Sequence, residues 1–124
     1  MKLPIKIANI VCLTLLLLAT GVVSASDRYI GSWAAGEKEV LQITKDGQAL
    51  KAQFVREGLF KNFEKVDFPA KVVDGNLTIS FDQGDLSATY DEARNVLILG
   101  GFKQFEKITA NEARSMIALL QKSQ

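Results

Sequence analysis

The chain has 124 residues, and its 15 Lys and Arg residues nearly balance its 14 Asp and Glu residues, for a formal net charge of +1. Because basic and acidic residues alternate along the chain, the sequence excludes the clustered basic surface of a nucleic-acid binder. It has no His and a single Cys, Cys12, which excludes Cys-His and Ser-His-Asp catalysis and zinc sites of the imidazole or thiolate type.

The first 25 residues are typical of a secretory signal peptide. Lys2 and Lys6 precede an apolar run from Ile10 to Ala19, and small residues follow up to Val23-Ser24-Ala25. A basic start, about 7 to 15 apolar residues and a small-x-small end are the features that define such a signal. We therefore predict cleavage between Ala25 and Ser26, and export to the periplasm or the extracellular space.

The alternative for this segment is an uncleaved membrane anchor over Ile7 to Val23. One Asn and two Thr interrupt that stretch, whereas a span needs about 20 apolar residues, so we expect no stable membrane span after cleavage. Removing residues 1–25 leaves 99 residues, with 13 basic residues against 14 acidic ones and a net charge of −1. A chain of this length predicts one domain with one core, residues 26–124.

The exported part alternates apolar and polar residues between closely spaced turn signals. Asp46-Gly47 and Asp74-Gly75 are the strongest of these, because a tight hairpin turn needs positive φ at its centre. Alternation with a period of two gives each strand one buried and one solvated face, as in antiparallel sheets. The apolar members of the successive runs are Leu41 and Ile43; Leu50, Ala52 and Phe54; Val66, Phe68, Ala70 and Val72; Leu77, Ile79 and Phe81; and Leu86, Ala88 and Tyr90.

Three further segments complete the series of strands: Tyr29 to Trp33, Val96 to Leu99 and Phe102 to Ile108. The continuous apolar run at Val96 to Leu99 indicates a strand that is covered on both faces. We predict a mainly β fold, an antiparallel up-and-down meander of about eight short strands that forms a small barrel or curved sheet. Pro69 cannot donate a ladder hydrogen bond, so its strand should lie at an edge or carry a bulge.

The period of the pattern changes after Ile108. Thr109 and Glu112 have the spacing of a capping box at the start of a helix, and apolar residues follow at helical spacing from Ala113 to Leu120. This predicts an amphipathic helix over about residues 110–122, whose apolar stripe covers an open face or an end of the barrel. A partner helix or a membrane is the alternative target for the stripe.

Residues 56–67 are the place where the strand alternation breaks. Phe60 and Phe63 have the spacing of one side of a helical turn, with Lys61 and Lys65 on the other side. An aromatic-rich connection at a barrel mouth is a common position for a binding loop. As a binding loop, its phenylalanines would supply apolar contact and its lysines would select an anionic or carboxylate head group. As a simple crossover, its phenylalanines would complete the core.

Gly31-Ser32-Trp33 stands at the entrance to the first strand, ahead of the hairpin meander and the C-terminal helix. This arrangement resembles the lipocalins and their calycin relatives, in which the tryptophan of a Gly-x-Trp motif plugs the closed end of the barrel. The resemblance implies structural roles for Gly31 and Trp33. The chain departs from that family in having no second motif of the Thr-Asp-Tyr type and no paired cysteines. Small exported barrels that inhibit proteases or lysozyme are similar in size and destination, although they commonly carry cysteines.

The acidic pairs of the chain stand at predicted turns. Asp82 and Asp85 flank Gln83-Gly84, and Asp91 precedes Glu92. Asp favours turns because its side chain bonds nearby backbone N–H groups, and the first of these turns is too short for a calcium loop. We therefore predict no metal site, no cofactor and no enzyme activity.

Together these patterns predict an exported, non-enzymatic binding module. A barrel of about eight short strands nearly fills its own interior, which favours a partner protein of the cell envelope or the secreted space. One alternative is a carrier of a small apolar or anionic lipid-like ligand, which would require an enclosed apolar cavity. Another is an inhibitor of a hydrolase, acting through a free tail, Ser26-Asp27-Arg28. An exposed aromatic patch on a filled barrel would favour the partner protein.

Overall fold

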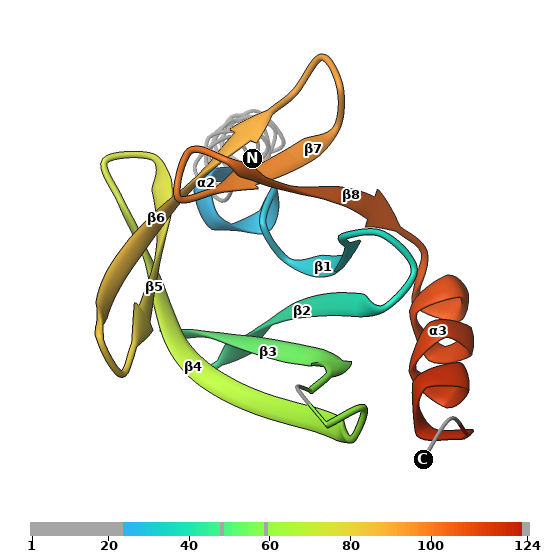
Figure 1. Cartoon of the computed structure of the whole chain (residues 1–124). Coiled ribbons are helices and arrows are strands. Elements are labelled where there is room, and N and C mark those ends of the chain that lie inside the picture. The colour runs from blue at the N-terminus through green and yellow to red at the C-terminus, as the bar shows by residue number, and fades with distance from the viewer. Residues whose placement is uncertain (1–23, 48, 59, 123–124) are drawn as a thin grey trace, which may run out of the picture.

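The computed structural model describes residues 24–47, 49–58 and 60–122, so the basic and apolar parts of the predicted signal peptide lie outside it. Within this part of the chain, eight antiparallel strands follow one another as a meander, and β1 pairs with β8 to close a barrel (Figure 1). The predicted fold is therefore confirmed. The strands are β1 (Gly31–Ala34), β2 (Glu39–Asp46), β3 (Ala49–Glu57), β4 (Phe63–Val73), β5 (Asn76–Phe81), β6 (Gly84–Asp91), β7 (Val96–Leu99) and β8 (Lys103–Ile108), and the helices are α2 (Ser24–Asp27) and α3 (Ala110–Lys122).

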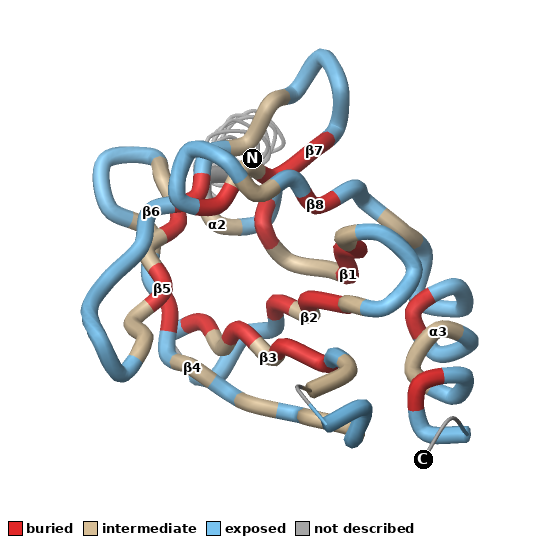
Figure 2. Tube along the Cα trace, viewed as in Figure 1, coloured by how far each residue is buried: buried red, intermediate tan, exposed pale blue. Residues whose placement is uncertain are grey.

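The hairpin connections after β2 and after β4 begin at the two predicted Asp-Gly pairs. Between β4 and β5, Asp74 and Gly75 have φ values of 53° and 84°, the two positive values that a tight hairpin turn requires. The strand register places inward-facing residues opposite one another on neighbouring strands, since Leu41 lies opposite Phe54 and Phe54 lies opposite Val66. Side chains of one parity thus line the interior, and Figure 2 shows buried residues alternating with more exposed ones along β2 and β3.

Helix α3 has the predicted bounds and the predicted cap. The Thr109 hydroxyl accepts a hydrogen bond from the Glu112 N–H at 3.1 Å, and the Glu112 carboxylate accepts one from the Thr109 N–H at 3.0 Å. The apolar stripe packs on the outside of the barrel wall, where the buried Ala113 and Leu120 cluster with outward-facing Val40 and Val55. The stripe therefore covers a wall of the barrel and not one of its ends.

Strand β7 differs from its prediction, whereas β4 agrees with its prediction. In β7, Val96 is buried and Ile98 is only partly so, which means that the outer face of this strand is incompletely covered. The β4–β5 ladder ends with the pair Ala70 and Ile79, next to Pro69. The first half of β4 is accordingly a sheet edge, as the missing N–H of proline predicts.

Candidate functional site

One end of the barrel is closed by packed side chains of the described residues. Trp33 and Tyr29 are buried there, the indole Nε1 donates to the Tyr29 carbonyl at 3.0 Å, and the Tyr29 hydroxyl donates to the Gly75 carbonyl at 2.5 Å. The Lys107 Nζ lies 4.5 Å from the centre of the Trp33 ring and donates to the Ile30 carbonyl at 2.9 Å.

Gly31 makes room for this lysine. Its φ is 138°, and a Cβ atom at this position would clash with the Lys107 Nζ. Partial burial lowers the pKa of the Lys107 ammonium group, while burial raises the pKa of the Tyr29 phenol. The closed end is therefore a packed and hydrogen-bonded floor in which Gly31 and Trp33 have structural positions.

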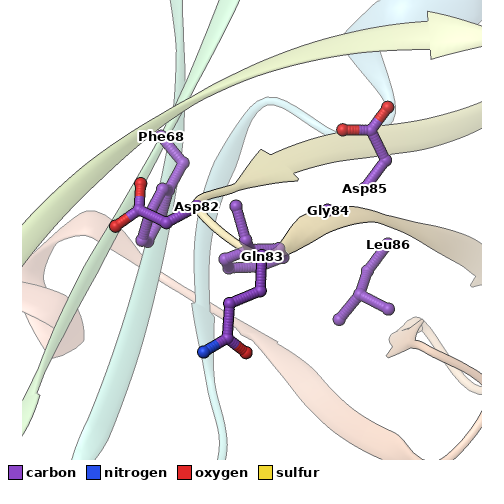
Figure 3. A pocket seen from close by; sticks show the side chains of 7 residues that line it. Phe68, Asp82, Gln83, Gly84, Asp85 and Leu86 are labelled. Atoms are coloured by element: carbon purple, nitrogen blue, oxygen red, sulfur yellow. The ribbon is translucent and has the colours of Figure 1, made fainter.

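The opposite end, where the β5–β6 and β7–β8 turns lie, is not filled to its rim, and we call it the barrel mouth. It contains an outer pocket of about 480 Å³ between β4 and the β5–β6 turn (Figure 3). An inner pocket of about 220 Å³ adjoins it toward β7 and β8. The outer pocket is lined by Phe68, Phe81, Asp82, Gln83, Gly84, Asp85 and Leu86.

Phenylalanine rings form the base of the mouth. The centres of the Phe68 and Phe81 rings are 4.7 Å apart, and Phe54 lies 5.6 Å from Phe81 and 6.0 Å from Phe68. Phe54 is buried, but Phe68 and Phe81 remain partly exposed. Beside them, Leu86 is 41% exposed and Phe102 is 79% exposed. The mouth thus presents apolar surface that the protein itself leaves in contact with water.

The basic groups at the mouth are paired, whereas two acidic groups are not. The Lys103 ammonium group donates to the Glu39 carboxylate, and the Arg56 Nε lies 3.2 Å from a carboxylate oxygen of Glu64. Asp82 and Asp85 are exposed and make no side-chain hydrogen bond or ion pair with the residues that the structure describes. Negative charge therefore flanks the outer pocket.

The four residues that the sequence singled out as a binding loop do not converge on one cavity. Phe60 is 91% exposed in the loop between β3 and β4, and Phe63 is half-buried against the cluster beneath α3. Lys65 is exposed on the outer side of β4, opposite Val55. The expected helical turn is wrong, because the residues from Phe63 onward form a strand.

Lys61, the fourth of these residues, lines a different groove. This groove, of about 650 Å³, lies between the loops and the C-terminal half of α3, where Leu119 is 67% exposed. Lys61 itself has a φ of 61°. The binding role of the four residues stays a prediction, and the structure divides them between the core under α3, this groove and the solvent.

Sequence reasoning placed Phe68, Phe81 and Leu86 on strands but did not recognise them as a site. The alternation of apolar and polar residues indicated that these side chains face inward. It does not indicate which inward-facing side chains remain uncovered at the end of the barrel. The sequence signal that could have located the site is the position of these residues next to turns, since Phe81 and Leu86 adjoin the β5–β6 turn and Phe102 follows Gly100-Gly101. Large apolar residues next to a turn lie at a barrel rim, where few side chains remain to cover them.

Two features were not found in the described part of the chain: clusters of metal-ligating side chains and membrane-spanning helices. Its His, Cys, Asp and Glu side chains form no group of three or more that could hold a metal ion. None of the helices there has the length and apolarity that a bilayer crossing takes. Comparison of the chain with protein-family models, with curated proteins and with solved structures finds no match.

Proposed function

We propose that this chain is an exported, non-enzymatic binding module that holds a partner protein at its barrel mouth. The proposal rests on the outer pocket, in which Leu86 and the partly exposed Phe68 and Phe81 form an apolar part of the lining. Exposed apolar surface around a concave site is typical of interaction sites. The absence of His from the sequence removes the commonest acid–base catalyst.

A partner protein suits this site better than an enclosed small molecule. Ligand-binding cavities commonly surround 70–90% of a ligand or more, whereas the outer pocket is a surface hollow at the tip of a hairpin. Phe102, which lines the adjoining inner pocket and is 79% exposed, is the kind of aromatic anchor that protein interfaces bury.

A second candidate, a carrier of a small apolar ligand, is favoured by one observation. The outer and inner pockets share Phe68, Phe81 and Leu86, so a short apolar chain can run from one into the other. An inhibitor with a free N-terminal tail has less support. Ser26 and Asp27 belong to α2, and their carbonyls accept hydrogen bonds from Tyr29 and Ile30.

We further propose that the barrel is lipocalin-like. Support comes from the eight-stranded closed meander with its C-terminal helix and from Trp33, which lies buried at the closed end as the Gly-x-Trp resemblance implies. Export rests on the predicted signal peptide, whose cleavage point after Ala25 falls within α2. N-terminal sequencing of the exported form should read Ser-Asp-Arg-Tyr. An intact Met1 in the membrane fraction would refute cleavage.

Native mass spectrometry of the exported protein, purified from its own host, tests the binding proposal. Two matched double variants each replace one exposed phenylalanine and one exposed leucine: Leu86→Ser with Phe102→Ser at the mouth, and Phe60→Ser with Leu119→Ser on the α3 side. The mouth variant should lose the co-purifying partner, and the α3-side variant should retain it.

The other outcomes of this experiment are equally informative. Loss of the partner only from the α3-side variant would move the site to the Lys61 groove and overturn the proposal. A small apolar molecule in place of a protein would favour the carrier. Both variants should keep the fold of the unaltered protein, because exposed substitutions usually change stability by no more than about 0.5 kcal/mol each.

A further inference from the structure

Strand β4 has a partner along only part of its outer edge. On one side it pairs with β3 from Phe63 to Ala70. On the other side it pairs with β5 only from Ala70 to Val73. In the part of the chain that the structure describes, no strand pairs with this outer edge from Phe63 to Pro69, which we call the free β4 edge.

Proline explains where the β4–β5 ladder ends. Continued register would place Pro69 opposite Ser80, but proline has no N–H to donate. The β5–β6 hairpin continues beyond this point as a two-stranded ribbon, paired as far as Phe81 and Gly84. Figure 1 shows the first half of β4 running away from the tip of that hairpin. The barrel therefore has a split between the free β4 edge and the hairpin tip.

The free β4 edge presents main-chain donors and acceptors that no neighbouring strand satisfies. Backbone N–H and C=O groups are strong hydrogen-bonding groups, and an unpaired strand edge is a template for another extended chain. Added strands gain affinity from main-chain hydrogen bonds and specificity from pockets for alternate side chains. A helix or a compact side chain cannot satisfy a row of edge groups in this way.

Such a side-chain pocket lies beside the edge. Val66 and Phe68 are the apolar inward-facing residues of the free β4 edge, with Val66 opposite Phe54, and Phe68 also lines the outer pocket. A chain laid along the edge would place one of its alternate side chains in this pocket. Asp82 and Asp85 flank the pocket without ion pairs to described residues, so a basic residue next to the apolar one fits the charge.

We infer that the free β4 edge, Phe63 to Pro69, binds an extended segment of a partner protein by strand addition, with an apolar side chain of that segment in the outer pocket. The inference rests on the proposed function and adds the mode of binding to it. A second copy of this chain fits less well. In a symmetric β4–β4 pair centred on Val66, Glu64 of the second copy would lie opposite Phe68, so its carboxylate would face an apolar pocket flanked by Asp82.

A backbone-methylation experiment separates strand addition from side-chain binding alone. The probe is the peptide acetyl-Lys-Val-Thr-Val-Thr-Lys-amide, which alternates apolar and polar residues and is basic at both ends. Two versions carry N-methyl groups, one on both valines and the other on both threonines. Successive residues of a strand direct their N–H groups to opposite edges, so the two versions block opposite edges and keep every side chain.

Binding is measured by titration into isotope-labelled protein, with the backbone amide signals of residues 63–69 and 80–86 as the readout. One methylated peptide should bind roughly tenfold more weakly than the parent or worse, because it loses its hydrogen bonds to the edge, while the other stays within about threefold. A version with Glu in place of both Lys should bind more weakly, and the difference should shrink in high salt.

Several results would overturn the inference. Equal binding of both methylated peptides, with shifts still centred on residues 80–86, would leave the mouth as a site but remove strand addition. Loss of both methylated peptides, or no binding of the parent at about 1 mM, would reject it as well. Concentration-dependent dimerisation that protects the amides of residues 63–69 from hydrogen exchange without any peptide would assign the edge to a second copy.

Discussion

At the closed end of the barrel, the large side chains of Trp33 and Tyr29 are buried and each polar atom they carry has a hydrogen-bond partner. At the mouth, Phe68 and Phe81 also face inward, yet they remain partly exposed, and the β4–β5 ladder beside them ends at Ala70, next to Pro69. Both ends derive from the same alternation of apolar and polar residues. A filled and hydrogen-bonded end stabilises the fold, whereas an incompletely filled end leaves apolar surface and main-chain groups exposed, where we propose that a partner binds.

The largest expected effect comes from breaking the closed end. Trp33→Ala should cost about 3 to 5 kcal/mol of unfolding free energy, the usual range for deleting a large buried aromatic side chain. Chemical denaturation measures this cost, and Phe102→Ala at the mouth is the matched aromatic deletion, expected to cost no more than about 0.5 kcal/mol. Equal losses in the two variants would remove the distinction between the ends.

Fluorescence gives an independent check of the same residue. Trp33 is the single tryptophan of the chain, and it is fully buried. Its emission should therefore be blue-shifted and poorly quenched by iodide. Ready quenching would mean that the closed end is open to solvent.

Phe63 tests whether the first residue of β4 belongs to the core or to the binding surface. It is half-buried and packs on the cluster under α3, so Phe63→Ser should cost about 1 to 2 kcal/mol, part of the loss expected for a fully buried ring. Thermal and chemical unfolding measure the loss. A variant that keeps full stability but no longer binds the partner would return Phe63 to the binding loop predicted from the sequence.

Tyr29→Phe removes one hydrogen bond from the closed end and should cost about 1 kcal/mol at neutral pH, since the Gly75 carbonyl loses its donor. Burial raises the pKa of Tyr29 above its ordinary value of 10.0. The unfolded phenol therefore ionises first, and the stabilising contribution of Tyr29 is complete below pH 10 and is lost as the pH rises through the folded-state pKa.

The pKa shift of Lys107 changes the free energy of unfolding in the opposite direction, also at alkaline pH. Its pKa is lowered from 10.5 by partial burial, so the folded state loses the proton first. The cost of holding the charged form in the fold therefore disappears as the pH rises through the folded-state pKa, and it is gone above the ordinary value of 10.5. The difference in stability between the unaltered protein and Tyr29→Phe isolates the tyrosine. That difference should shrink with rising alkaline pH, and a constant difference would contradict the raised pKa.

The smallest effect on stability is expected at Phe60. Its side chain is 91% exposed, so Phe60→Ser should change the unfolding free energy by no more than about 0.5 kcal/mol. Denaturation of this variant beside Phe63→Ser tests whether the two phenylalanines of the predicted loop have different roles, and the loss should be larger for Phe63→Ser. A loss at Phe60 as large as that at Phe63 would contradict the exposed position of the loop.

Local patterns in the sequence were sufficient to predict the meander, the turns and helix α3. Alternation of apolar residues, Asp-Gly pairs and the Thr109–Glu112 cap act over a few residues, and the structure contains each of them where it was predicted. Pro69 likewise predicted an edge or a bulge in its strand, because a missing N–H is a property of the residue itself.

The tertiary structure alone decided how these elements meet. The register of β3 with β4 placed Phe63 under α3 and Phe68 at the mouth, and closure of β1 on β8 brought Lys107 onto Trp33. These contacts join residues that are distant in the chain, so no short pattern specifies them. Which end of a barrel is filled depends on the summed volumes of side chains from several strands, and for that reason the pocket at Phe68, Phe81 and Leu86 became visible only in the folded chain.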